Sequence, residues 1–161
     1  MAAEELKVPD ELAQYIGKID PPHVREVEKG SIRRYADALG NPNPLYYNEE
    51  YAADSPYGCI IAPPGFFGWS KQSIPQSEGI IGLMGAMINA GYAGILDGGM
   101  AYEFFLPVRA DDTLIAYTKV KDIQAKAGKK DMMITQFETT YLNQNGDTVA
   151  KASQTLIGRK L

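Results

Sequence analysis

The chain has 161 residues, of which 45% are hydrophobic and 22% are charged. This balance predicts one globular domain over residues 1–161, large enough to bury a core without disulfides or metal ions. The formal net charge is −4 and the charges are dispersed along the sequence. We therefore expect no nucleic-acid partner, because such binding needs a basic surface that follows the phosphates.

Metal, cofactor and membrane signals are missing from the sequence. The single cysteine, Cys59, excludes an internal disulfide and is typical of a reducing compartment, so we expect a soluble cytoplasmic protein. The single histidine, His23, lies far from Cys59, and neither a zinc-type spacing nor a nucleotide-binding glycine loop occurs. We expect no metal ion and no cofactor. The most apolar stretch, residues 79–96, is interrupted by glycines and an asparagine, which argues against a membrane span.

The first forty residues predict short elements separated by prolines and glycines. Residues 11–16 are expected to form a helical turn or two, and residues 23–29 a short strand. Residues 31–39 place apolar side chains at the spacing of one helix face. Ser31 is its predicted N-cap, and Gly40 stands where a glycine commonly follows the last helical turn.

A polar loop follows at residues 40–48. Its two prolines fix φ and remove backbone donors, so the loop is rigid and cannot continue the helix. Asn48 is placed to cap a second short helix, with Glu49 and Glu50 in the first turn, where the helix dipole favours anions. Local chemistry alone predicts a turn that reverses the chain, and any functional role depends on the rest of the sequence.

Two apolar segments come next. Residues 64–73 are predicted to form a central apolar helix, because proline is tolerated in a first helical turn and Pro75 would end it. Residues 76–93 are apolar but rich in glycine, and two interpretations stay open. The segment is either a glycine-loosened helix or loop that covers the core, or an adaptable wall of a ligand site or oligomer contact.

The last part of the chain alternates apolar and polar residues. Four strands are predicted, at residues 100–106, 113–120, 132–142 and 148–157. Asn145 and Gly146 form a strong hairpin signal before the last strand. Because one face of an antiparallel sheet must be covered, the helix at residues 64–73 is the expected filler. The predicted fold class is α+β, with a curved antiparallel sheet wrapped around a central helix.

Three motifs resemble those of the MaoC-like dehydratase family, whose members have the hot-dog fold. Residues 40–48 are similar to the family loop G-D-x-N-P-[apolar]-H-x-D. Residues 61–65 lie where the family has I-A-H-G-M, which opens its central helix. Residues 104–112 are similar to the strand signature F-x-x-P-V-x-x-G-D. The motifs agree in order and spacing, and the resemblance covers about residues 24–158.

The resemblance implies a reaction and the groups that perform it. Residues 48–53 and 62–64 are most similar to the N-terminal or FAS1-like dehydratase branch, which includes the substrate-binding subunits of mycobacterial hydroxyacyl-ACP dehydratases. In the family, a loop aspartate and histidine activate water for addition to a 2-enoyl thioester, or remove it from a 3-hydroxyacyl thioester. A glycine N–H at the start of the central helix polarises the thioester carbonyl.

This sequence departs from the family at all three positions. Asn41 replaces the aspartate, and an amide does not accept a proton near neutral pH. Tyr46 replaces the histidine, and a phenol with a pKa of about 10 stays protonated at pH 7. Pro64 replaces the glycine and has no N–H, although Gly65 offers one next to it. Since acid–base catalysis contributes about 10²–10⁴-fold, we expect no efficient catalysis by the family mechanism.

The first functional hypothesis is a catalytically silent hot-dog subunit, dimerised with a homologous chain that carries the aspartate and histidine. The dimer would act on an acyl-CoA or acyl-ACP thioester, and this chain would bind the acyl group. The expected substrate-binding residues are Asn43, Pro64, Gly65, Phe66, Phe67, Trp69, Met84 and Met87. The aromatic residues and methionines among them are equally consistent with plain core.

Two further hypotheses stay open. The second is an active enzyme on its own, with a displaced base among Asp37, Glu49, Asp97 and His23. Asp37 and Glu49 are also explained as solvated helix residues, and His23 as a residue at the edge of a strand. The third is a non-enzymatic acyl-thioester binder or structural homodimer. Activity of the purified chain, alone or only with a second hot-dog chain, discriminates among the three.

Overall fold

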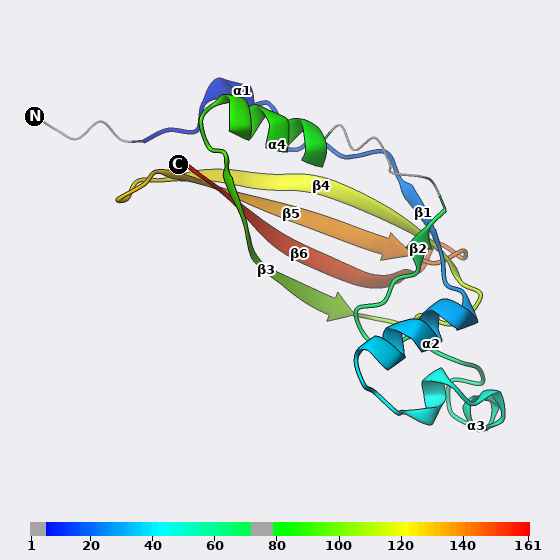
Figure 1. Ribbon diagram of the computed structural model, residues 1–161. Coiled ribbons are helices and arrows are strands. Elements are labelled where there is room, and N and C mark those ends of the chain that lie inside the picture. The colour runs from blue at the N-terminus through cyan, green and yellow to red at the C-terminus, as the bar shows by residue number, and fades with distance from the viewer. Residues whose placement is uncertain (1–5, 72–78) are drawn as a thin grey trace, which may run out of the picture.

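The computed structural model of the protein describes residues 6–71 and 79–161 (Figure 1). Its centre is a six-stranded antiparallel sheet with the strand order β2-β1-β4-β5-β6-β3. The strands are β1 (His23–Glu26), β2 (Trp69–Ser70), β3 (Gly94–Phe104), β4 (Thr113–Lys126), β5 (Met132–Leu142) and β6 (Thr148–Arg159). The helices are α1 (Asp10–Ala13), α2 (Lys29–Ala38), the 3-10 turn η1 (Pro44–Tyr46), α3 (Glu49–Ala53) and α4 (Ile80–Asn89).

One face of the sheet carries the hydrophobic core, because side chains alternate between the two faces of a strand. A bulge between Val120 and Asp122 in β4 preserves this alternation, so that Ile123 again faces the core opposite Thr135. We call this side of the sheet the core face. It holds two separate hydrophobic clusters, one towards each end of the long strands.

The two clusters have different covers. At the α4 end, helices α1 and α4 lie over the sheet, as Figure 1 shows. At the loop end, α2, η1 and the segment before β2 close the core. The cluster at the α4 end comprises Leu12, Leu83, Met87, Tyr92, Val120, Ile123, Met133 and Phe137. The larger cluster at the loop end includes Ile32, Tyr46, Phe66, Phe67, Leu114 and Tyr141.

The predicted strands are confirmed, and β5 has the predicted bounds. β3 begins six residues earlier than predicted and β4 runs to Lys126. Gly146 takes a φ of +85°, which the hairpin between β5 and β6 requires. Helix α2 begins at Lys29 with Glu28 as its N-cap, so the prediction of Ser31 as the cap is wrong. Gly40 follows that helix with a φ of +63°, as expected.

The prediction of a central helix at residues 64–73 is wrong for its described part. The Phe66 N–H donates to the Pro63 carbonyl at 3.1 Å, and Gly65 has a φ of +91°. Proline followed by a positive-φ glycine is the composition of a type II turn. Gly68 also has a positive φ, which a right-handed helix excludes, and β2 follows directly. Residues 72 and 73 lie outside the described residues.

Helix α4 covers the sheet instead. For residues 80–89 the first of the two open interpretations, a helix over the core, is confirmed. Leu83 and Met87 are fully buried on its inner side, whereas Ile81 and Ile88 are exposed. Burial of this face holds the helix in spite of its glycines. The α+β class with a curled antiparallel sheet over a helix is thus confirmed, but a different segment supplies the helix.

Candidate functional site

The loop at residues 41–48 is held by its own asparagines. The Asn41 Oδ1 accepts the backbone N–H of Asn43 at 3.1 Å. The Asn43 Oδ1 accepts the N–H of Leu45, also at 3.1 Å, and so caps η1. Asn48 caps α3 by accepting the N–H of Tyr51 at 3.0 Å, as the sequence predicts. These side-chain amides therefore order the loop backbone.

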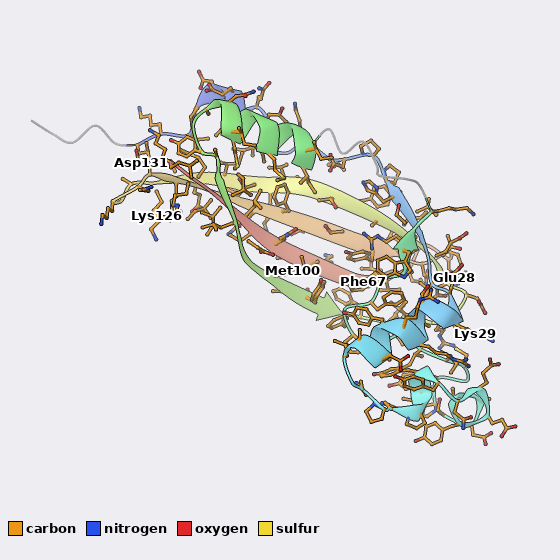
Figure 2. The ribbon with its side chains drawn as sticks, viewed as in Figure 1. Glu28, Lys29, Phe67, Met100, Lys126 and Asp131 are labelled. Carbon is orange, nitrogen blue, oxygen red and sulfur yellow. The ribbon has the colours of Figure 1, made fainter. Side chains whose placement is uncertain are left out.

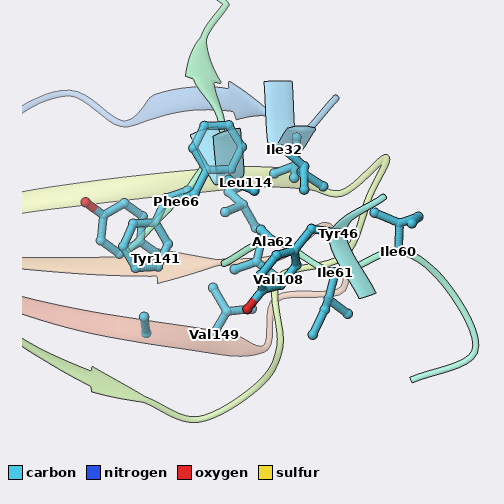
Figure 3. Packing of buried hydrophobic residues seen from close by; sticks show 14 of the residues in the cluster. Ile32, Tyr46, Ile60, Ile61, Ala62, Phe66, Val108, Leu114, Tyr141 and Val149 are labelled. Atoms are coloured by element: carbon cyan, nitrogen blue, oxygen red, sulfur yellow. The ribbon is translucent and has the colours of Figure 1, made fainter. Parts of the chain in front are cut away.

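A pocket of about 380 Å³ opens beside this loop. It lies where η1, the turn at residues 63–66 and the segment after β3 meet. Figure 3 shows Tyr46, Ile61, Ala62 and Val108 packed together at this end of the sheet. The lining residues are Asn43, Leu45, Tyr46, Tyr57, Ile61, Ala62, Pro63, Pro64, Gly65, Phe66, Phe67, Phe104, Phe105, Leu106, Pro107 and Val108.

The chemistry of the pocket is apolar and aromatic. Among the described residues that line it there is no carboxylate and no imidazole. Its ionisable side chains are the phenols of Tyr46 and Tyr57. Tyr46 is only 6% exposed and belongs to the hydrophobic cluster. The described pocket walls therefore offer neither of the two side-chain types that act as the base in the family mechanism.

The oxyanion-binding feature of the family mechanism also differs. Gly65 lines the pocket, but it lies in a turn and not at the start of a helix. The N–H of Gly65 therefore acts without the positive end of a helix dipole. The start of α4 faces a carboxylate of the chain itself, since the Gly79 N–H donates to the buried Asp20 Oδ1 at 2.6 Å. Among the described residues, no α-helix begins at this pocket.

The structure brings together most, but not all, of the predicted site residues. Six of them line the pocket: Asn43, Tyr46, Pro64, Gly65, Phe66 and Phe67. Asn41 instead lines a separate shallow hollow with Asp37 and Tyr47. Trp69 lies on β2, is 62% exposed and meets Phe66 edge-to-face. Met84 and Met87 belong to α4, and Met87 is buried in the cluster at the far end of the core face.

The four displaced-base candidates all lie outside the pocket. Asp37 accepts the Tyr47 hydroxyl at 3.0 Å, and burial together with this carboxylate raises the pKa of Tyr47. Glu49 is exposed and pairs with the Lys29 Nζ at 3.2 Å. Asp97 accepts the Gly99 N–H at 2.9 Å, where β3 bulges. His23 is half-buried at the start of β1.

Sequence reasoning missed a part of the pocket wall. Tyr57 and residues 104–108 line it, although they were not among the expected site residues. The signal for the second group was present, because residues 104–108 belong to the strand signature that resembles the family motif. Tyr57 follows a turn-forming segment, and nothing in its local pattern distinguishes it from a loop residue.

The strand next to the pocket exposes a row of large apolar side chains. β3 pairs only with β6, so its outer edge has no strand partner among the described residues. Figure 2 shows Met100 along β3 and Phe67 beside its end. The exposed side chains on and just after β3 are Leu96, Met100, Tyr102, Phe104, Phe105 and Leu106. Open strand edges and contiguous apolar patches are features of association surfaces.

Residues 6–71 and 79–161 contain neither a metal-binding cluster nor a membrane-spanning helix. No cluster of three or more histidine, cysteine or acidic side chains is arranged to hold a metal ion. Across the same ranges, every helix is too short or too polar to cross a membrane.

Comparison with known proteins supplies the family context. A family model described as a FAS1-like dehydratase domain region matches residues 14–152. A UPF0336 protein of Saccharopolyspora erythraea is 30% identical over 146 residues, which cover 90% of this chain and 89% of that protein. The match therefore extends over nearly the full length of both sequences.

Two solved complexes contain chains with this fold. One chain of the ChsH1-ChsH2 complex from Mycobacterium tuberculosis superposes with a TM-score of 0.79 at 15% identity, covering 94% of this chain and 95% of that one. A chain of the HadBC complex, a (3R)-hydroxyacyl-ACP dehydratase from the same organism, gives a TM-score of 0.64 at 25% identity, with coverage of 89% and 97%. At 15% identity, the first similarity supports the fold alone.

Proposed function

Because the chain belongs to the MaoC-like dehydratases with the hot-dog fold, in their FAS1-like branch, we propose that it is the substrate-binding subunit of an acyl-thioester dehydratase or hydratase. A second hot-dog chain would supply the aspartate and histidine. The first chain would hold the acyl group of a CoA or ACP thioester, and the second would add or remove water.

One observation carries this proposal. The pocket beside the family loop is formed, but its described lining contains neither a carboxylate nor an imidazole. At the two proton-transfer positions, Asn41 uses its carbonyl oxygen on the loop backbone and Tyr46 is buried in an apolar cluster. The family scaffold thus keeps the space for an acyl group without the groups that move protons.

The position of the pocket favours a two-chain assembly. Phe104, Phe105 and Leu106 line the pocket and also belong to the exposed row at β3. A partner that added its own strand to the open edge of β3 would cover these side chains and close the pocket on that side. Residues of the partner would then lie beside an acyl group bound here.

The relatives are consistent with this arrangement. HadBC is by its name a complex of two kinds of chain that acts as a (3R)-hydroxyacyl-ACP dehydratase. At 25% identity, it supports a substrate of the same broad class for this chain. Acyl length and carrier are separate questions, because the pocket volume fits a ligand of many shapes.

The test is co-expression with candidate hot-dog chains, followed by native mass measurement and a hydratase assay on crotonyl-CoA. We expect a heterodimer that is active and a purified single chain that is inactive. Met100→Lys places a charge in the exposed row of β3 and should abolish both association and activity. Ile88→Lys is the matched control, since Ile88 is similarly exposed but lies on α4.

Two other outcomes would contradict the proposal, each in a distinct way. Efficient hydration by the purified chain alone would support the displaced-base hypothesis, and Asp37, Glu49, Asp97 and His23 would then be replaced in turn. Thioester binding without turnover in any pairing would support the non-enzymatic binder. Gain of activity in the single chain on Asn41→Asp combined with Tyr46→His would show that only the proton-transfer groups are missing.

A further inference from the structure

A single arginine side chain lies on the core face of the sheet. Arg25 of β1 pairs directly with Leu114 of β4, and directly paired residues of antiparallel strands point to the same face. Leu114 is fully buried in the cluster at the loop end. The guanidinium of Arg25 extends over β4 to reach the Tyr141 ring of β5, with its Cζ 6.0 Å from the ring centroid.

The charge of Arg25 has no acidic partner among the described residues. Its Nε is buried and makes no hydrogen bond. Its Nη1 donates to the carbonyl oxygen of Gly68 at 3.3 Å. The neighbouring Glu26 is engaged elsewhere, since its carboxylate pairs with the Lys71 Nζ at 2.7 Å. A guanidinium carries five N–H donors, so most of them remain available to a ligand.

The Tyr141 and Tyr102 phenols lie near this guanidinium, and Tyr35 lies near Tyr102. Phe67 stacks on Tyr141 with ring centroids 4.1 Å apart and lies 5.6 Å from Tyr102. Burial raises the pKa of both tyrosines, and the nearby charge of Arg25 opposes this rise in each. Tyr35 is close enough to Tyr102 to raise its pKa further. Arg25, Tyr35, Tyr102 and Tyr141, from four different elements, thus converge; we call them the Arg25 cluster.

Arg25 makes one hydrogen bond to a described residue, from its Nη1 to the Gly68 carbonyl, and the nearby phenol hydroxyls can each donate one and accept hydrogen bonds. Figure 3 shows the Tyr141 hydroxyl directed away from the residues of the loop end, along the sheet. An anion that accepts hydrogen bonds would match both the charge and the donors of this cluster.

The cluster adjoins the pocket. Tyr35 packs against Phe66 with ring centroids 5.0 Å apart, and its hydroxyl lies 3.4 Å from the position of a Cβ built on Gly65. Gly65, Phe66 and Phe67 all line the pocket. Phe66 and Phe67 therefore form a shared wall between the pocket and the cluster, and an acyl chain that carries a terminal group from the pocket to the guanidinium would have to pass these rings.

We propose that the Arg25 cluster binds the carboxylate of a carboxyacyl thioester, an acyl group with a second acid function at its far end. The inference deepens the proposed function, on which it rests, by naming the substrate class. Guanidinium and carboxylate match in geometry and charge. A carrier phosphate fits less well, because the cluster lies on the core face behind aromatic side chains, and Tyr141 is only 9% exposed.

The test measures binding to the purified chain by calorimetry. Glutaryl-CoA and the longer suberyl-CoA are compared with their neutral counterparts, pentanoyl-CoA and octanoyl-CoA. Free CoA and inorganic phosphate report any phosphate site. We expect one carboxyacyl thioester to bind roughly tenfold or more tightly than its neutral counterpart, because a hydrogen bond to a charged group is stronger than a neutral one. Free CoA and phosphate should not compete for this selectivity.

Substitutions test whether Arg25 and Tyr102 cause the preference for the carboxyacyl thioester. Arg25→Met should remove it, and Arg25→Lys should retain only a part, because lysine keeps the charge but not the fork. Tyr102→Phe removes one hydroxyl from a 40% exposed side chain and should weaken the selectivity without affecting folding. Arg159→Met is the matched control: Arg159 also has a buried, unpaired Nε, but it pairs with Met132 at the other end of β5.

Equal binding of charged and neutral thioesters to the wild-type chain would overturn the inference, as would selectivity that is undiminished in both Arg25→Lys and Tyr102→Phe. Competition by inorganic phosphate would assign the cluster to a phosphate instead. These outcomes are independent of the proposed function, since the assay needs neither a partner nor turnover. Conversely, carboxylate selectivity without activity in any pairing would refute the dehydratase role and leave the binding site standing.

Discussion

The two ends of the core face use the same sheet for different purposes. At the α4 end, Leu12, Leu83, Met87 and Met133 are all completely buried, and helix α4 lies over them. At the loop end, prolines, glycines and aromatic rings pack around a pocket of about 380 Å³. Flexible aliphatic side chains fill space, whereas turns with fixed φ and stiff rings leave it open. The α4 end thus serves packing alone, whereas the loop end combines the larger hydrophobic cluster with the pocket.

The largest expected effect is a loss of stability caused by a substitution at the α4 end. Leu83→Ala deletes a fully buried side chain and should lower the free energy of unfolding by about 2–5 kcal/mol, because a cavity remains. Urea denaturation measures the loss. Ile81→Ala, on the 56% exposed side of the same helix, should change it by less than about 0.5 kcal/mol. If the two ends are separable, thioester binding per folded molecule stays unchanged in Leu83→Ala; a coupled loss would disprove the separation.

Replacement of glycine by alanine should destabilise the protein at the loop end and stabilise it at the α4 end. Gly65→Ala forces a side chain into a φ of +91° and should destabilise by about 1–2 kcal/mol while also weakening ligand binding. Gly85→Ala lies inside α4 with open space around the added Cβ, and should stabilise by about 0.5–1 kcal/mol. Thermal and urea unfolding of both variants provide the measurement. If both variants changed the free energy of unfolding in the same direction, the backbone at Gly65 would not be the positive-φ turn described above.

A smaller effect is expected at the border of the loop. Asn48→Ala removes the side-chain oxygen that accepts the Tyr51 N–H at 3.0 Å. The loss of this cap should lower the free energy of unfolding by about 1 kcal/mol. Asn48→Asp should retain most of it, since a carboxylate also accepts the N–H and favours the helix dipole. A loss in Asn48→Asp as large as in the alanine variant would contradict this account of the cap.

The smallest effect appears only at alkaline pH. Burial raises the pKa of Tyr141, with Arg25 acting in the opposite direction. The unfolded chain, with an ordinary phenol pKa of about 10, therefore loses this proton first as the pH rises. The contribution of the Tyr141 proton to the free energy of unfolding is therefore complete below about pH 10. It is lost as the pH rises through the pKa of Tyr141 in the folded chain. Stability measured above pH 10 should fall less steeply in Tyr141→Phe, and an unchanged slope would exclude Tyr141 as a contributor.

Local patterns predicted β4 and β5 well because apolar and polar residues alternate along much of both strands. The bounds of β5 and the glycine turn before β6 follow from alternation and from the positive φ at Gly146. The caps at Asn48 and the glycine at position 40 are equally local. These features depend on neighbouring residues alone, so the sequence contains enough information to locate them.

The interior helix and a part of the site could not be predicted from the sequence, because both depend on tertiary contacts. Proline, proline and glycine at residues 63–65 fit either a helix start or a type II turn, and packing at the loop end selects the turn. Helix α4 forms in spite of its glycines because Leu83 and Met87 are buried. The sequence does not distinguish Arg25 from the other charged residues of the strand predicted at residues 23–29, and only its pairing with Leu114 places it on the core face. No local pattern distinguishes these alternatives.

The central claim is that the scaffold binds an acyl thioester but does not itself move the protons. The hydratase rate of the purified chain on crotonyl-CoA, before and after addition of a partner hot-dog chain that carries the loop aspartate and histidine, tests it most directly. We expect no turnover above background for the chain alone and a rate at least about 10²-fold higher for the pair, the smallest contribution typical of acid–base catalysis. The same rate with and without the partner would contradict the account.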